Sequence, residues 1–140
     1  MAHNIYNMSD KKYSDLKKAV LNSQNIEKLV KKATMITGRK QDVVRKSILK
    51  AMIQIEARTG KSALEVFEKS VENSMPFFDE TSPIKEERAE AIALRWIINC
   101  SMEETFDIRL ANNIIEAAEN KGLVVNRKNE VLKKTLEKGN

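Results

Sequence analysis

Apolar residues recur at helical spacing through most of this chain, and turn-forming residues are scarce between them. The 140 residues include only four glycines and two prolines, too few for the many tight turns of a β-sandwich. The clearest stripe falls on one face of a helix and consists of Ala89, Ile92, Ala93, Trp96, Ile97 and Cys100. The pattern predicts an all-α fold in which amphipathic helices surround one core.

We expect a single domain of about six helices and no strand, since the length suits one core. The expected helices span residues 25–37, 41–58, 62–75, 83–100, 101–121 and 127–138. Gly60 fits the left-handed position beyond a helix end. Two pairs, Ser62 with Glu65 and Ser101 with Glu104, match the capping box that begins a helix.

Charge is distributed unevenly along the chain, although its net value is only +5. Residues 1–70 carry 15 basic and 7 acidic residues, residues 71–120 carry 4 and 11, and residues 121–140 carry 6 and 2. We interpret residues 1–24 as a basic N-terminal extension and residues 25–140 as a helical domain. On charge alone, solvated helix faces are the favoured explanation of this mixed charge, and the alternative is a polyanion-binding surface.

Few residues could support catalysis or bind a metal ion. Cys100 is the only cysteine and lies on the apolar stripe, and His3 is the only histidine. Glu86 and Glu87 suit the start of a helix, where the macrodipole favours acidic side chains. We therefore expect no enzyme, no cofactor, no metal ion and no small-molecule substrate. No apolar run approaches the roughly 18 residues of a membrane span, so we expect no membrane partner.

Clustered cations are the candidate binding residues, because lysine and arginine bind phosphates. Arg39 and Lys40 follow Gly38 in a turn between two helices, where long side chains reach outward. The complete candidate set is Lys11, Lys12, Lys28, Lys31, Lys32, Arg39, Lys40, Arg127, Lys128, Lys133 and Lys134, with Lys17 and Lys18 beside the first two. Each alone is usually a solvated side chain, but together they predict a phosphate-binding face.

Four collinear blocks resemble one family, the bacterial-type ribosomal protein seven of the small subunit. The longest block spans residues 58–76, from the end of one expected helix through the next. The others are residues 29–40, which end in Gly38-Arg39-Lys40, residues 91–96 and residues 109–125. The resemblance covers roughly residues 25–135, and correct order and spacing make it more specific than a short motif.

The resemblance implies a mostly helical structural protein bound to the 3′ major domain of small-subunit ribosomal RNA. Such a protein supports assembly of the subunit head among neighbouring head proteins, close to exit-site tRNA and mRNA. It has no catalytic residues. Carried onto this chain, the RNA contacts would be Arg39, Lys40, Arg127 and Lys128, together with Lys11 and Lys12. The alternative from composition alone is a helical DNA-binding regulator, which predicts a symmetric dimer.

Two departures from the family pattern bear on partners and location. Residues 77–87 form a short acidic interval where the family has a basic β-hairpin, and Pro83 is expected in the first turn of the helix that follows. We expect the acidic stretch 79–90 to face a protein or solvent instead of RNA. Leu132 stands where the family usually has histidine, and the family's aromatic tail is absent.

This trimming and the absence of a targeting pattern in the first ten residues bear on where the protein works. Trimming of this kind favours the small subunit of a mitochondrial ribosome, with a plastid or the bacterial cytoplasm as alternatives. Exit-site tRNA and mRNA contacts become less expected without the hairpin.

Overall fold

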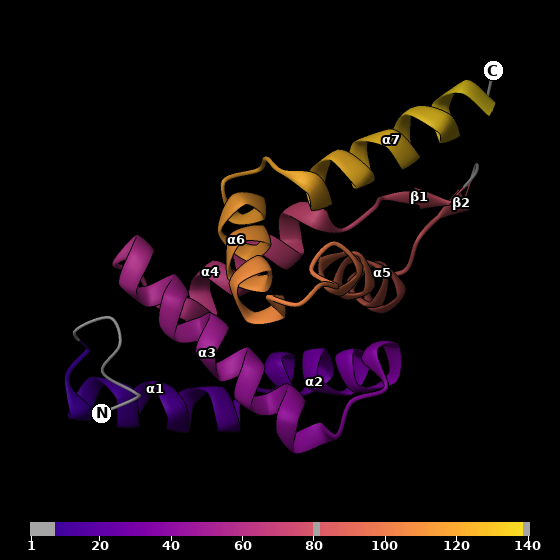
Figure 1. Cartoon of the computed structure of the whole chain (residues 1–140). Helices are drawn as coiled ribbons and strands as arrows, with labels where there is room; N and C mark the ends of the chain where they lie inside the picture. The colour runs from indigo at the N-terminus through magenta and orange to yellow at the C-terminus, as the bar shows by residue number, and fades with distance from the viewer. Residues whose placement is uncertain (1–7, 80–81, 139–140) are drawn as a thin grey trace.

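The structure is a computed structural model that describes residues 8–79 and 82–138, so His3 and Glu80 lie outside the described residues. Within those ranges the chain forms seven helices and one short two-stranded ladder (Figure 1). The elements are α1 (Asp10–Asn22), α2 (Gln24–Thr37), α3 (Gln41–Thr59), α4 (Ala63–Ser74), β1 (Phe78–Asp79), β2 (Ser82–Pro83), α5 (Glu86–Asn99), α6 (Phe106–Ala118) and α7 (Leu123–Lys138). The all-α single domain is confirmed.

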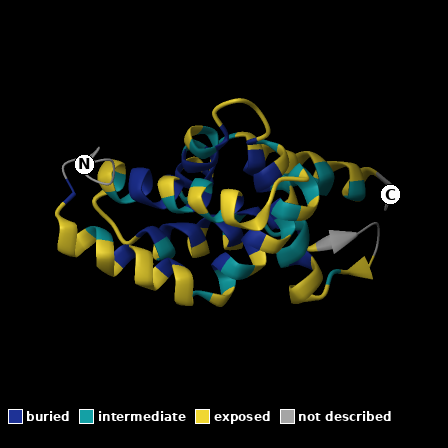
Figure 2. Ribbon diagram, turned by 60° about the horizontal axis from the view of Figure 1, so that its bottom comes forward, coloured by how far each residue is buried: buried dark blue, intermediate teal, exposed yellow. Residues whose placement is uncertain are grey.

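The core forms where α6 packs against both α3 and α4. Phe67 of α4 and Leu110 and Ile114 of α6 have no exposed surface. Figure 2 shows the buried residues gathered where the helices face one another, and the exposed residues on their outer sides. Gly60 ends α3 with φ at 69°, a left-handed conformation that side chains with a Cβ rarely adopt, as expected.

The first helix was not among the six expected. Only Leu16 and Val20 of its 13 residues are buried, so its apolar stripe is too sparse to stand out in the sequence. Its start is capped by Ser9, whose Oγ accepts a hydrogen bond from the backbone N–H of Lys12 at 3.1 Å. The helix packs against α2 and α3 and thereby joins the core.

Neither predicted capping box forms. Ser62 occupies the cap position of α4 without a side-chain cap bond, and Glu56 on α3 accepts the hydrogen bond from the Ala63 N–H at 3.0 Å instead. Ser101 is fully buried, and α6 begins five residues later than predicted. The Ser101 hydroxyl donates to the Ile97 carbonyl and accepts from the Asn113 amide, so it connects α5 to α6. A contact with a neighbouring helix, which a local motif does not encode, replaces the predicted cap in both cases.

The interval between α4 and α5 is a short turn with a minimal ladder. β1 and β2 pair antiparallel over two residues each, with Phe78 opposite Pro83. This ladder is the one departure from the expectation of no strand, and it places Pro83 before α5 instead of in its first turn. An extended hairpin arm is not present between residues 77 and 86 in the described part of the chain.

The last helix begins at Leu123, four residues before the predicted start, because Val124 and Val125 are buried against the body of the fold. Lys128 anchors it further. Its Nζ donates to the Asn73 carbonyl oxygen at 3.1 Å and lies 4.6 Å from the centroid of the Phe77 ring. Burial lowers the pKa of Lys128.

We expect Phe67→Ala to lower the free energy of unfolding by about 3–5 kcal/mol, because it opens a cavity between α4 and α6. Leu136→Ala, at a residue 61% exposed on α7, is the control and should change it by less than about 0.5 kcal/mol. Urea unfolding followed by circular dichroism measures both. A loss below about 1 kcal/mol for Phe67→Ala would contradict the placement of the core.

We expect Lys128→Gln to destabilise the protein by about 1–2 kcal/mol, because it removes the hydrogen bond to Asn73 and the contact with the Phe77 ring. Lys133→Gln removes the same charge from an exposed position on α7 and should leave stability within about 0.5 kcal/mol. Thermal unfolding of the two variants compares them directly. Equal melting temperatures would show that the anchor contributes nothing.

Candidate nucleic-acid interface

Three of the candidate lysines line one groove between α2 and α5. Lys28, Lys31 and Lys32 line a hollow of about 430 Å³, together with Glu87 of α5, the exposed Met35 and the buried Leu94. The Nζ of Lys28 lies 3.0 Å from Glu90 Oε1 on α5, so its charge is already paired within the fold. Lys31 is exposed and Lys32 half-buried, which leaves Lys31 the most accessible of the three.

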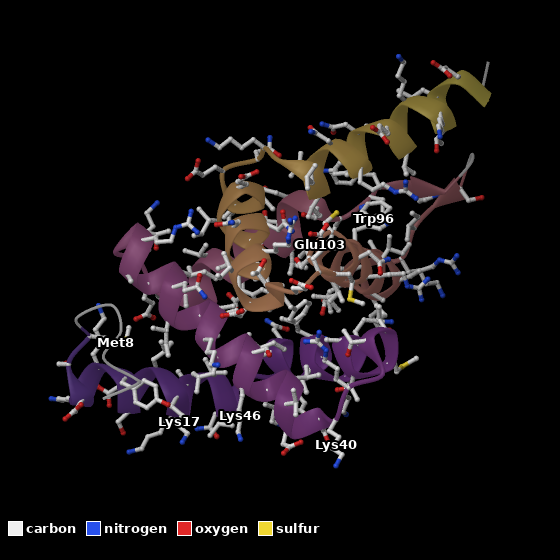
Figure 3. All side chains as sticks on the ribbon, viewed as in Figure 1. Met8, Lys17, Lys40, Lys46, Trp96 and Glu103 are labelled. Atoms are coloured by element: carbon white, nitrogen blue, oxygen red, sulfur yellow. The ribbon has the colours of Figure 1, made fainter. Side chains whose placement is uncertain are left out.

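The turn after α2 presents two more cations. Gly38 adopts φ of 70°, which ends α2 and lets the chain reverse into α3. Arg39 and Lys40 are both exposed, and Lys40 occupies the cap position of α3 (Figure 3). The guanidinium carbon of Arg39 lies 5.9 Å from the centroid of the Phe106 ring, which steers its side chain along the surface.

A cationic rim between α1 and α3 includes a residue that the sequence analysis missed. Lys17 on α1 and Lys46 on α3 line the same pocket and extend toward the same edge of the molecule (Figure 3). Lys46 could have been found, because Asp42, Lys46 and Lys50 recur every fourth residue and so share one polar helix face. Arg45, next to Lys46, serves the fold instead.

An ion pair joins Arg45 on α3 to Glu27 on α2, with 2.7 Å between Nη1 and Oε2. The hydrogen bond from Arg45 lowers the pKa of Glu27, and the same bond raises the pKa of Arg45. The pair contributes little stability because both side chains are partly solvated, but it fixes the side chain of Arg45 against α2. Arg45 is therefore not available to phosphate in the way that Lys46 is.

The remaining candidates lie at two other places. Lys11 and Lys12 are exposed in the first turn of α1, and Lys17 lies farther along the same helix. Arg127, Lys133 and Lys134 are exposed on α7, which Figure 1 shows at the other side of the molecule from α1 and α2. The candidates thus form two separate groups, and the half-buried Lys128 lies between α7 and the end of α4.

Acidic residues surround a different groove, formed by α4 and α5 beside the start of α2. Four glutamates line it, two from each long helix, namely Glu68, Glu72, Glu86 and Glu90. Its volume is about 360 Å³, and Phe67 and Leu94 contribute to its apolar floor. The ion pair between Lys28 and Glu90 marks the boundary between this acidic groove and the cationic groove of α2.

The described residues contain neither a candidate metal centre nor an activated cysteine. No group of three or more histidine, cysteine, aspartate or glutamate side chains within residues 8–79 and 82–138 could hold a metal ion. Burial raises the pKa of the half-buried Cys100 thiol, which keeps it protonated and a poor nucleophile. In the same ranges no helix is long and apolar enough to cross a membrane.

Comparison with known proteins agrees with this picture of a helical binding protein. The family model described as ribosomal protein S7p/S5e matches residues 5–136, which extends the resemblance seen in the sequence through α1. Small ribosomal subunit protein uS7 of Lachnospira eligens is 33% identical over 129 residues, an alignment that covers 81% of each chain. The chain therefore belongs to the ribosomal protein S7 family, whose members are non-enzymatic constituents of the small ribosomal subunit that bind ribosomal RNA.

Proposed function

We propose that this chain binds the 3′ major domain of small-subunit ribosomal RNA and supports assembly of the subunit head. The observation that carries the proposal is a set of exposed cations on α1, α2, α3 and the turn that follows α2. Its members are Lys17, Lys31, Arg39, Lys40 and Lys46. We call this set the α2-end surface. We include Lys11 and Lys12 as its extension along α1, and Arg127, Lys133 and Lys134 as a second RNA contact.

The physical mechanism is release of counterions from the phosphate backbone. Each lysine or arginine that neutralises a phosphate frees a condensed cation, so binding weakens as salt rises. Lys31, Lys40 and Lys46 are exposed, so their ammonium groups stay hydrated and accessible to phosphates in the folded protein. The packed helices hold their backbones in fixed positions, so recognition follows the shape of the RNA more than its base sequence.

We further propose that residues 79–90 face a protein or solvent. Glu86 and Glu87 are exposed in the first turn of α5, where Lys85 and Arg88 flank them along the chain. Phosphates would be repelled by carboxylates at this position. The ladder β1–β2 pairs only two residues of each strand, so it does not extend away from the helices as a long hairpin would. Any contact with exit-site tRNA or mRNA would therefore be made by the helices.

We assign the protein to a mitochondrial ribosome in preference to a plastid or bacterial one. The short acidic interval between α4 and α5, together with a composition rich in lysine, asparagine and isoleucine, supports this choice. The family match gives no support to a DNA-binding regulator.

Charge reversal tests the α2-end surface. We expect Arg39→Glu with Lys40→Glu to weaken binding to a transcript of the 3′ major domain about tenfold or more at fixed salt. The slope of log K against log salt should fall in magnitude by about 1 for each lost contact. A filter-binding titration at several salt concentrations measures both quantities.

The control is Lys61→Glu with Lys69→Glu, which changes net charge equally beside Glu65 and Glu119 on another side of the molecule. This variant should bind nearly as well as the wild type. Equal losses in the two double variants would mean that only net charge matters, and the assignment of the surface would be wrong.

Association with the subunit tests the wider proposal. We expect the tagged protein to co-sediment with small subunits from isolated mitochondria after a high-salt wash, because a protein held at many phosphates within folded RNA exchanges slowly. Sucrose-gradient fractions probed for the tag give the result. Recovery with cytosolic ribosomes alone would refute the mitochondrial assignment, and recovery only at the top of the gradient would refute the ribosomal role.

A further inference from the structure

Helices α1, α2 and α3 enclose a largely apolar pocket, and contacts between lysines and phosphates would not fill it. Its volume is about 440 Å³, within the range of pockets that hold small molecules. The wall is largely apolar and includes Leu21, Ile26 and Leu49, with the aromatic ring of Tyr13 on one side. Leu21 is 54% exposed at its edge, so part of the apolar wall is open to solvent.

The rim of the pocket is cationic. Lys17 and Lys46 are exposed, and neither forms an ion pair within the described part of the chain. Figure 3 shows their side chains directed to the same edge. Arg45 also lines the pocket but is held by Glu27, so the two lysines are the cations free to meet a ligand. An apolar hollow between two lysines suits a ligand with a flat apolar part and flanking negative charges.

We propose that this pocket receives one unpaired nucleotide of the bound RNA, with its base against Tyr13 and its flanking phosphates at Lys17 and Lys46. The inference rests on the proposed RNA-binding function and adds a defined subsite to it. Bases that leave the stack are commonly held on aromatic side chains in this way, while lysines contact the backbone. A free nucleotide would lack the second flanking phosphate, so a strand fits the two-lysine rim better.

Asp42 gives the subsite a preference among bases. It is the one carboxylate among the described residues of the pocket wall, and it lies in the first turn of α3. A carboxylate accepts hydrogen bonds from amino groups. Adenine, cytosine and guanine each carry an exocyclic amino group with two N–H donors, whereas uracil offers a carboxylate only its single ring N3–H. The pocket should therefore accept any of those three bases in preference to uracil.

Photocrosslinking locates the nucleotide. We expect Leu21→p-benzoylphenylalanine, in the full chain bound to the 3′ major domain transcript, to crosslink to one unpaired adenosine, cytidine or guanosine. Reverse-transcription stops identify the position. The control, Leu136→p-benzoylphenylalanine at the exposed end of α7, should not label that nucleotide. A crosslink to residues 1–7 of the same chain, to a second copy, or to no partner would overturn the proposal.

Affinity measurements separate this inference from the proposed function. Tyr13→Leu removes the flat ring and should weaken RNA binding about tenfold, whereas Tyr13→Phe should retain wild-type affinity. Changing the crosslinked nucleotide to uridine should weaken wild-type binding about fivefold and Asp42→Asn binding by less than twofold. If Arg39→Glu with Lys40→Glu loses binding while Tyr13→Leu does not, the function stands and the subsite is refuted.

Discussion

Burial of α6 between α3 and α4 is the interaction on which the other elements depend. Leu110 and Ile114 on α6 pack against this pair of helices, and each such buried side chain contributes about 1.5–3 kcal/mol through the hydrophobic effect. The Asn113 amide, 7% exposed, donates to the buried Ser101 hydroxyl, so the chain entering α6 is tied to the same core. Because α6 occupies the centre, the peripheral helices can carry the exposed charged side chains. These are α1, the outer side of α2, and α7.

Ion pairs decide which of the many cations remain available to RNA. Lys28 faces Glu90 and Arg45 faces Glu27, both across helix boundaries. Such partly exposed pairs add little stability, but they hold two cations close to carboxylates. Lys31 and Lys46, each within about a turn of one of those residues, form no ion pair among the described residues, although the charge of Lys31 also helps to lower the pKa of Glu27. Counting lysines and arginines along the sequence therefore overstates the charge that a phosphate backbone can reach.

Sequence patterns predicted α2 to α6 because their apolar stripes are dense. They also predicted α7 as a basic helix, although only Val124 and Val125 are buried among its described residues. They missed α1, in which only Leu16 and Val20 are buried. They also identified the exposed turn at Arg39 and Lys40, since a left-handed glycine marks it locally. They could not separate Lys128 from Lys133, because the difference depends on Asn73 and Phe77, far away in the chain. Contacts of that kind follow from tertiary packing, which no spacing rule records.

The acidic middle of the chain lies beside the cations that we propose to bind RNA. The α4–α5 groove carries four glutamates and is separated by the Lys28–Glu90 pair from the cations of α2. A negative groove beside a positive surface makes the interaction energy depend strongly on which side approaches a phosphate backbone. The carboxylates that reduce the net charge to +5 therefore weaken nonspecific binding to RNA. They also disfavour binding in the wrong orientation. A uniformly basic protein of the same length would bind more tightly in every orientation, and so would discriminate less.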